Sequence, residues 1–286
     1  MISDITLGQF FPGYSPIHKL DPRSKILISI VFIVSVFLAN NPISLAFLTV
    51  SVMALVAVSR ISFSVVFKGV KPIIIIVLIT AVINVFMTKG AGAPLLSFWI
   101  INIYTEGIVR AIFMALRVIL LIIGSSILLT YTTSPISLTD GLESLLSPLK
   151  VIKVPVHTFA MMMSIALRFI PTLVEETEKI MNAQKSRGAD FSSGGLIKRA
   201  KSLIPILIPL FVSSFKRAEE LAVAMESRCY RGDKNRTKLV KLQFRGVDIA
   251  FFALTLLFLA ALLSLVILPY KIGYSGLVFD IMFYRV

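Results

Sequence analysis

Five apolar stretches, separated by short polar turns, limit how this 286-residue chain can fold. A helix that crosses a bilayer needs about 20 mainly apolar residues, and 57% hydrophobic against 15% charged residues is far from the usage of a soluble domain. The predicted spans are residues 26–39, 43–58, 72–87, 107–130 and 249–268. The first two are short, and the turn Asn40-Asn41-Pro42 between them predicts a tight helical hairpin. We therefore expect an all-α integral membrane protein with about five transmembrane helices.

The distribution of basic residues predicts the orientation of these spans. Six basic residues lie before the first span or between the second and third: Lys19, Arg23, Lys25, Arg60, Lys68 and Lys71. By contrast, the stretch 88–105 between the third and fourth spans carries only Lys89. Basic residues gather on the cytoplasmic side, so we expect a multi-pass protein of the cell membrane with a cytoplasmic N-terminus.

The net charge of +14 has its main source in one segment. Residues 131–247 hold 18 Lys or Arg against 10 Asp or Glu, and the predicted topology places them in the cytoplasm. No nucleic-acid-binding signature accompanies this charge, so we do not expect nucleic acid as a partner. The expected partner of the basic residues is the lipid bilayer. The expected organisation is membrane helices over 1–131, a cytoplasmic helical region over 132–247, and a final membrane helix with its tail over 248–286.

Two long amphipathic helices are predicted within the basic segment. The first opens after residues 152–155 and ends near Gly188, where a left-handed C-cap is expected, and Pro171 should kink or divide it. The second runs from Leu196 to about Arg228. They end in the tripeptides Ser186-Arg187-Gly188 and Ser227-Arg228-Cys229. Each arginine thus lies where exposed helix carbonyls favour a cation and where its planar donor fork can reach a partner.

Other candidate residues have two readings each. Arg110 and Arg117 lie seven apart on one span: intramembrane charge suggests function, but outward snorkelling of Arg110 and structural pairing of Arg117 are the simpler readings. Met161, Met162 and Met163 suit an adaptable partner surface, although methionine clusters usually fill cores. The helix carboxylates, including Glu175 and Glu176, are expected on a solvated face rather than in a catalytic pair.

Catalytic and metal sites are not expected in this chain. Cys229 is the only cysteine, and His18 and His157 are far apart in sequence. The chain also lacks the G-x-x-x-x-G-K-[ST] phosphate loop of many ATPases.

Three groups of residues together resemble the transmembrane (T) component of energy-coupling factor transporters. Residues 8–13 and 18–25 are similar to that family's N-terminal signature, residues 167–173 and 183–191 to its first coupling motif, and residues 217–222 and 224–232 to its second. The likeness covers nearly the whole chain. The family's usual tripeptide is Ala-Arg-Gly, so both sites here have Ser in place of Ala, and the second has Cys in place of Gly.

The resemblance implies a non-catalytic coupling subunit of an ATP-driven micronutrient, or vitamin, importer. Two cytosolic ATPase subunits would supply ATP, Mg and hydrolysis, and a small membrane protein would capture the substrate. The two tripeptides would dock the ATPases, and the three methionines are a candidate contact for the substrate-binding subunit. Because a left-handed backbone strains a side chain, we expect the second helix to continue past Cys229 toward Gly232.

Two alternatives remain. A secondary transporter acting alone would need a central polar site, whereas the polar groups of these spans are few: Asn84, Arg110 and Arg117 stand out. A membrane-anchored scaffold for a soluble partner would need no transport partners.

Overall fold

A computed structural model describes residues 10–88, 96–98, 101–189, 191, 195–230, 232 and 242–272. The chain forms two compact units, which are treated separately below. We call the described residues within 10–141 and 242–272 the membrane unit, and the described residues within 142–232 the crossed-helix unit.

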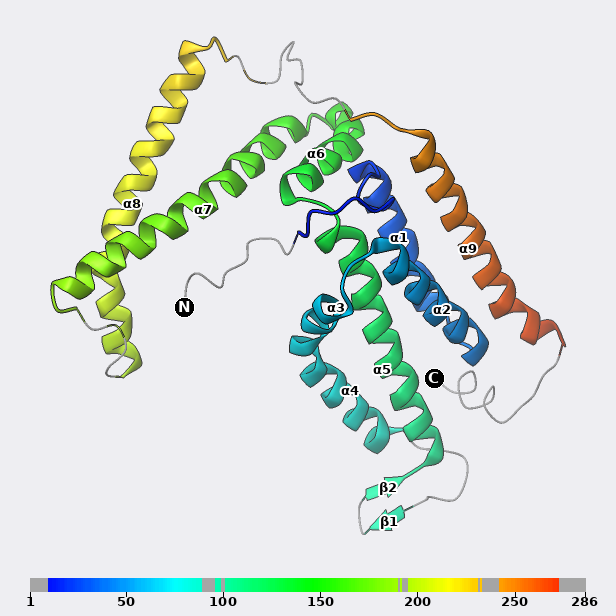
Figure 1. The fold of residues 1–286 in the computed structure, drawn as a ribbon. Helices are drawn as coiled ribbons and strands as arrows, with labels where there is room; N and C mark the ends of the chain where they lie inside the picture. Colours follow the sequence, from blue (N-terminus) through cyan, green and yellow to red (C-terminus); the bar gives the residue numbers. More distant parts are fainter. Residues whose placement is uncertain are drawn as a thin grey trace. The chain divides into compact units, whose positions relative to one another are not determined.

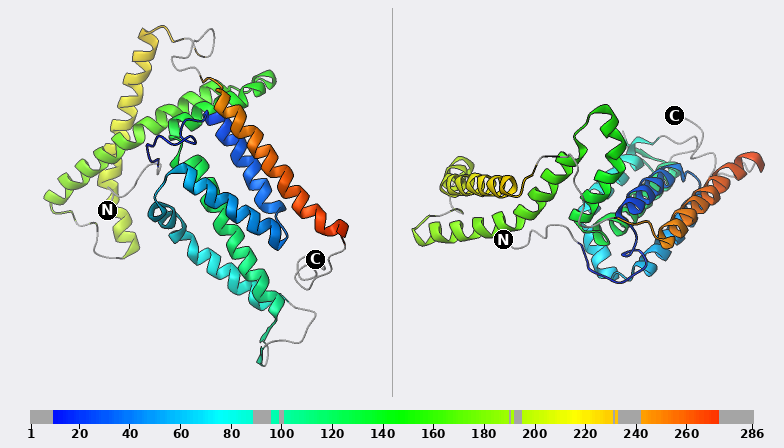
Figure 2. Two further views of the ribbon diagram at one scale, coloured as in Figure 1. Left: turned by 45° about the vertical axis from the view of Figure 1, so that its right-hand side comes forward. Right: turned by 90° about the horizontal axis from the view of Figure 1, so that it is seen from above.

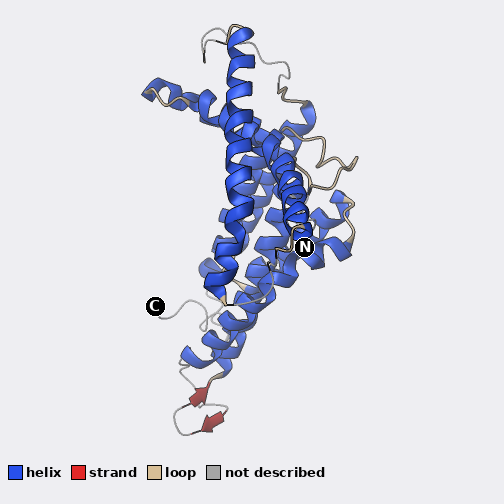
Figure 3. Ribbon diagram, turned by 90° about the vertical axis from the view of Figure 1, so that its left-hand side faces the viewer, coloured by secondary structure: helices blue, strands red, loops and turns tan. Residues whose placement is uncertain are grey.

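The membrane unit is a helical bundle with one small hairpin of strands (Figures 1 and 3). Its elements are α1 (Pro22–Leu38), α2 (Pro42–Ser59), α3 (Phe63–Val70), η1 (Lys71–Ile73), α4 (Ile74–Met87), β1 (Leu96–Phe98), β2 (Ile101–Ile103), α5 (Thr105–Ser125), the π-helical turn η2 (Ser126–Tyr131) and α9 (Gly246–Ile272). Helix α6 (Pro135–Leu146) leads from this unit into the next. The strands β1 and β2 pair antiparallel within the stretch that was predicted to be a loop.

In the described part of the chain, five helical segments are long and apolar enough to cross a membrane, and this confirms the predicted fold class. They are Pro42–Ser59, Phe63–Met87, Thr105–Tyr131, Val156–Ser186 and Gly246–Ile267. Four of these match predicted spans, although the third predicted span begins earlier, at α3. The first predicted span corresponds to α1, which has 17 residues with Arg23 and Lys25 in its first turn. The fifth qualifying segment is α7, which the sequence placed among the cytoplasmic helices.

The α1–α2 hairpin forms as predicted from its turn residues. Asn41 is the N-cap of α2 and Pro42 occupies its first position, where the missing N–H costs nothing. The Ser44 hydroxyl accepts from the Asn41 N–H at 3.1 Å and donates to the Asn41 carbonyl at 2.8 Å, so it holds the backbone of the turn. The Asn41 amide also donates to the Val266 carbonyl of α9, which fixes the turn against the last helix.

A core of buried side chains joins α1, α2, α5 and α9. Its fully buried members include Val36, Leu48 and Leu262. Helices α1 and α9 lie side by side, and α4 packs along α5 (Figures 1 and 2). The last helix therefore belongs to the same bundle as the first four, although about a hundred residues separate it from them in sequence.

A buried polar cluster holds the start of α1 against the start of α9. The Asp248 carboxylate accepts from the backbone N–H of Asp21 at 2.7 Å and of Arg245 at 2.8 Å. Asp21 in turn caps α1 by accepting from the Arg23 N–H. Lys25, 1% exposed, donates to the Thr132 carbonyl at 2.7 Å, immediately after η2. The starts of α1 and α9 and the end of η2 thus lie at one end of the membrane unit.

The segment before α1 is held by His18. Its Nε2 lies 2.9 Å from the Phe11 carbonyl, which can only accept, and its Nδ1 lies 2.7 Å from the Ser15 hydroxyl. The neutral ring with its proton on Nε2 satisfies both contacts. Burial lowers the pKa of His18, with a smaller contribution from the positive charge of Lys25, against the opposing effect of the Phe11 carbonyl. The neutral form is therefore favoured at neutral pH.

The crossed-helix unit consists of the end of α6, the 3-10 turn η3 (Ser147–Ile152) and two long helices, α7 (Val156–Ser186) and α8 (Leu196–Ser227). Both long helices begin and end close to the predicted positions. Helix α7 is not divided at Pro171, and α8 continues through Pro205 and Pro209. The imidazole of His157 lies 2.9 Å from the carboxylate of Glu143, which ties the start of α7 to α6.

Replacement of Asp248 by Ala should lower the stability of the membrane unit by about 2–3 kcal/mol, because it leaves the buried N–H of Asp21 without an acceptor. Thermal unfolding of the purified protein in detergent measures the change. Glu219→Ala removes an exposed carboxylate from α8 and is the matched control. Equal unfolding temperatures for the two variants would contradict the assigned role of Asp248.

Candidate functional site: two arginine-tipped helix ends

The C-terminus of α7 places Arg187 on an exposed helix tip. Arg187 is the C-cap residue, and Gly188 follows with φ +86°. The Gly188 N–H donates to the Lys185 carbonyl at 2.9 Å, and the Ala189 N–H donates to the Gln184 carbonyl at 3.0 Å. This pair of bonds is the Schellman motif, which satisfies carbonyls that the helix leaves unpaired. The left-handed cap predicted at Gly188 is confirmed.

The C-terminus of α8 repeats this geometry, so the predicted continuation past Cys229 is wrong. The helix ends at Ser227, Arg228 is the C-cap, and Cys229 itself is left-handed with φ +60°. The Cys229 N–H donates to the Glu226 carbonyl at 2.8 Å, and the Tyr230 N–H donates to the Met225 carbonyl at 3.0 Å. The two hydrogen bonds of the cap outweigh the roughly 1 kcal/mol by which a side chain disfavours this backbone.

The backbone at the two arginines is nearly the same. Arg187 has φ −87° and ψ 8°, and Arg228 has φ −91° and ψ 14°. Both side chains are exposed. The preceding serines also match, because Ser186 donates to the Asn182 carbonyl and Ser227 to the Val223 carbonyl, each four residues back. Ser in place of Ala therefore leaves its hydroxyl satisfied within the helix.

Helices α7 and α8 cross, and a carboxylate on α7 pins the crossing (Figure 1). Glu176 accepts from the Ser213 hydroxyl at 2.6 Å through one oxygen, and from the Arg217 guanidinium through the other. Sequence reasoning missed this contact by assigning Glu176 to a solvated face. The partners are 37 and 41 residues away along the chain, beyond the reach of any local pattern.

The crossing lies well inside both helices. Arg187 is 11 residues beyond Glu176 (187 − 176), whereas Arg228 is 15 residues beyond Ser213 (228 − 213) and 11 beyond Arg217 (228 − 217). At about 1.5 Å per residue, the α7 arm is about 16 Å long and the α8 arm about 16 to 23 Å. The two C-terminal arms diverge from the crossing (Figure 1). The unit thus presents two exposed arginines on separate helical arms.

The intramembrane arginines have separate surroundings. Arg117 on α5 donates to the Ala39 carbonyl at 2.6 Å and to the Asn40 side chain at 3.2 Å, so its guanidinium closes the end of α1. Arg110 lies nearer the start of α5 and is half-buried.

The methionines lie near the start of α7. Met161 is half-buried, whereas Met162 and Met163 are 54% and 42% exposed. Helix α8 exposes an apolar stripe at helical spacing: Ile204, Leu207, Ile208, Phe211, Val212 and Phe215. We call these six residues the α8 stripe. Within the described part of the chain, no cluster of three or more His, Cys, Asp or Glu side chains could hold a metal ion.

Comparison with known proteins assigns this arrangement to transport. Residues 13–239 match the family described as cobalt transport protein. The energy-coupling factor transporter transmembrane protein of Clostridium kluyveri is 55% identical over 267 residues, which cover 93% of this chain and 95% of that protein. The corresponding protein of Bacillus subtilis is 49% identical over 263 residues, covering 92% and 98%.

The apolar helices and these relatives define a multi-pass membrane component of a transporter. More narrowly, the chain belongs to the family of energy-coupling factor transporter transmembrane proteins, as its motifs predicted.

The shared left-handed cap predicts how the third residue of each tripeptide responds to substitution. Cys229→Gly should be neutral or stabilise the α8 tip, whereas Gly188→Ala should destabilise the α7 tip by about 1 kcal/mol, because only glycine adopts positive φ without strain. Hydrogen exchange at the amides of the last helical turns measures both effects. Ser186→Ala, which changes no backbone preference of this kind, is the control. Faster exchange in Cys229→Gly would contradict the assignment.

Proposed function

We propose that this chain is the non-catalytic coupling subunit of an ATP-driven micronutrient importer, in which Arg187 and Arg228 each dock one cytosolic ATPase subunit. The observation that carries this proposal is the repetition of one exposed arginine cap, with nearly the same backbone angles, at the ends of two crossed helices. A guanidinium presents five donors in a planar fork, which suits a groove lined by carbonyl or carboxylate oxygens. Two tips match two ATPases.

The crossing gives the tips a means to transmit force. Motion of either ATPase would act on the end of a helical arm, and the Glu176 contacts with Ser213 and Arg217 would carry that motion to the other helix. Because helices are stiff along their length, displacement at a tip moves the whole crossed pair rather than one loop. ATP and Mg would belong to the partner subunits, in agreement with the absence of a phosphate-loop motif from this sequence.

The membrane unit supports the placement of both tips on one side of the membrane. The chain leaves this unit after η2, where Thr132 contacts Lys25, and returns at α9, where Asp248 contacts Asp21. Exit and return are therefore at the same end, so α7 and α8 together cross the membrane twice or not at all. Among the described helices, α8 does not qualify as a span, which favours no crossing. The basic surplus of this segment then favours the cytoplasm and, with it, a cytoplasmic N-terminus.

The apolar surface of the crossed-helix unit is the proposed contact for the substrate-binding membrane subunit. The α8 stripe is a continuous unpartnered row, and Met162 and Met163 add side chains that repack easily. Capture of a vitamin or a similar micronutrient would belong to that subunit.

Arg110 and Arg117 would then stabilise the helix bundle rather than line a path for the substrate, as the Arg117 contacts with Ala39 and Asn40 indicate.

Replacement of both Arg187 and Arg228 by Ala should release the ATPases, because each lost charge-assisted contact costs about 2 kcal/mol or more in a buried groove. The measurements are the amount of ATPase that co-purifies with the membrane subunit and substrate uptake by proteoliposomes. Lys198→Ala with Arg199→Ala removes the same charge from the opposite end of α8 and should leave both values unchanged. Full ATPase retention in the Arg187/Arg228 double variant would refute the docking role.

Co-purification also separates the alternatives. A coupling subunit brings down two ATPases together with a small hydrophobic membrane protein. A secondary transporter acting alone needs none of these partners, and a scaffold needs only its soluble partner.

The single native cysteine provides a test of topology. Cys229 is exposed beside Arg228, so a membrane-impermeant maleimide should label it in inverted vesicles and leave it unlabelled in intact cells. A cysteine at Gly92, which lies outside the described residues, should show the opposite pattern in a Cys229→Ser background. Labelling of Cys229 from the outside would overturn the proposed orientation.

A further inference from the structure

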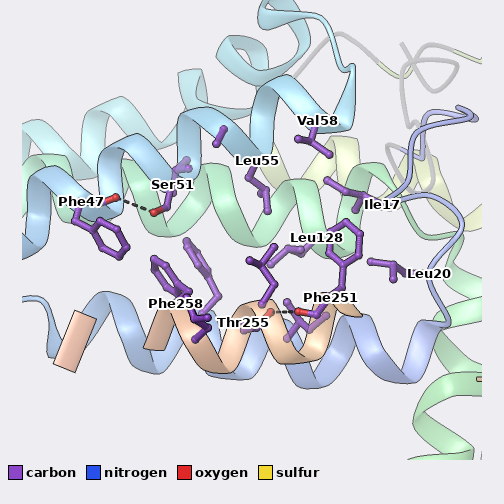
Figure 4. A pocket seen from close by; sticks show the side chains of 16 residues that line it. Ile17, Leu20, Phe47, Ser51, Leu55, Val58, Leu128, Phe251, Thr255 and Phe258 are labelled. Atoms are coloured by element: carbon purple, nitrogen blue, oxygen red, sulfur yellow. Dashed lines mark hydrogen bonds between the residues drawn. The ribbon is translucent and has the colours of Figure 1, made fainter. Parts of the chain in front are cut away.

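A groove runs along the membrane unit between α2 and α9, with side chains of α1 and η2 also lining it (Figure 4). Its volume is about 390 Å³. At one end the rings of Phe47 and Phe258 stack with centroids 5.4 Å apart. At the other end lie Ile17, Leu20 and Val58 (Figure 4).

The side chains that line the groove provide almost no free hydrogen-bonding groups for a polar ligand. Its two hydroxyls are satisfied within their own helices, because Ser51 donates to the Phe47 carbonyl and Thr255 to the Phe251 carbonyl, both at 2.8 Å. A bound water needs two to four polar partners, so water has no favourable position here. An empty groove would forfeit the dispersion contacts of every side chain along it. The walls therefore require an apolar occupant.

The position of the groove suits one lipid chain. Val58, Leu254 and Leu257 on its rim are 43%, 61% and 67% exposed, on segments that face lipid in a membrane-inserted bundle. From Phe47 to Val58 it follows 11 residues of α2, about 16 Å at ~1.5 Å per residue. One leaflet supplies half of the ~30 Å hydrocarbon core, which is nearly the same length.

Three basic residues lie close in sequence to lining residues, two of them at the end of the groove formed by Ile17, Leu20 and Val58. Lys19 immediately precedes Leu20, Arg60 follows Val58 by two residues, and Arg245 lies six residues before Phe251. All three are exposed. Basic side chains near a membrane surface attract anionic lipid headgroups.

We propose that this groove is a binding site for one acyl chain of an anionic phospholipid, with its headgroup held near Lys19, Arg60 and Arg245. The lipid belongs to the leaflet on the side of the N-terminal segment. It fills the apolar space between α2 and α9, so that the two helices pack through it as well as against α1. This site is independent of the arginine tips and of the proposed coupling role.

The test uses the full chain in nanodiscs that contain phosphatidylglycerol with a photoactivatable group in its acyl chain. Mass spectrometry after illumination should find crosslinks on the groove segments of α2 and α9. Ala54→Phe places a ring in the groove and should reduce these crosslinks at least about fivefold. Met53→Phe, on the same helix but outside the groove, should leave them unchanged. Crosslinks to the lipid-facing side of α4 report that both variants are folded and inserted.

Equal crosslinking of the groove in Ala54→Phe and wild type would overturn the proposal, because the label would then report general lipid contact. Loss of the groove crosslinks when the partner subunits are assembled would also overturn it, since a partner helix would be the occupant.

The headgroup is tested by comparing phosphatidylglycerol with phosphatidylcholine that carries the same acyl label. The preference for phosphatidylglycerol should fall about fivefold for each of Lys19→Gln, Arg60→Gln and Arg245→Gln, at unchanged total crosslinking. An unchanged preference in the triple variant would refute the anionic headgroup.

Discussion

One buried carboxylate, that of Asp248, decides how the membrane unit closes. It accepts from the first free N–H groups of two helices, at Asp21 and Arg245, across 227 residues of sequence. The N-terminus of a helix carries partial positive charge, so a single anion stabilises both ends at once. A shared cap is possible only if α1 and α9 run in the same direction and start at the same level. The insertion of the whole crossed-helix unit between η2 and α9 is therefore compatible with one intact bundle.

In the crossed-helix unit, the rigid contact between α7 and α8 and the exposed arginines lie at different places along the helices. Its stiffness comes from two helices of 31 and 32 residues pinned at Glu176, whereas the groups available to a partner lie at their far ends. The Schellman bonds stop each helix abruptly, which leaves the arginine at the end of an ordered arm rather than on a flexible loop. In the proposed coupling role, such an arm would transmit motion through the position of its end and through how firmly that end is held.

Local signals predicted the local structure well. The turn at Asn41, the cap at Gly188 and the limits of α8 follow from residues within a few positions of each feature. The failures have one physical origin, which is that tertiary contacts decided the outcome. Glu176 meets Arg217 only after the helices cross, and Asp248 meets Asp21 only after the bundle closes. Cys229 is the exception, since its left-handed backbone is a local feature; its preference was outweighed by hydrogen bonds to Met225 and Glu226.

The contact of Arg117 with Ala39 has a consequence for the bilayer itself. This contact places the α1–α2 turn beside the middle of α5, because Arg117 is twelve residues beyond the first residue of that helix, Thr105. Helix α1 is about 25 Å long, whereas the segment Thr105–Tyr131 is about 40 Å long. The two halves of the unit thus have different hydrophobic lengths. Lipid beside the α1–α2 hairpin has to thin, or α5 has to tilt, at a cost of fractions of a kcal/mol per ångström of mismatch. The mismatch thus lies on the side of the α1–α2 hairpin, and either the lipid or the tilt of α5 accommodates it.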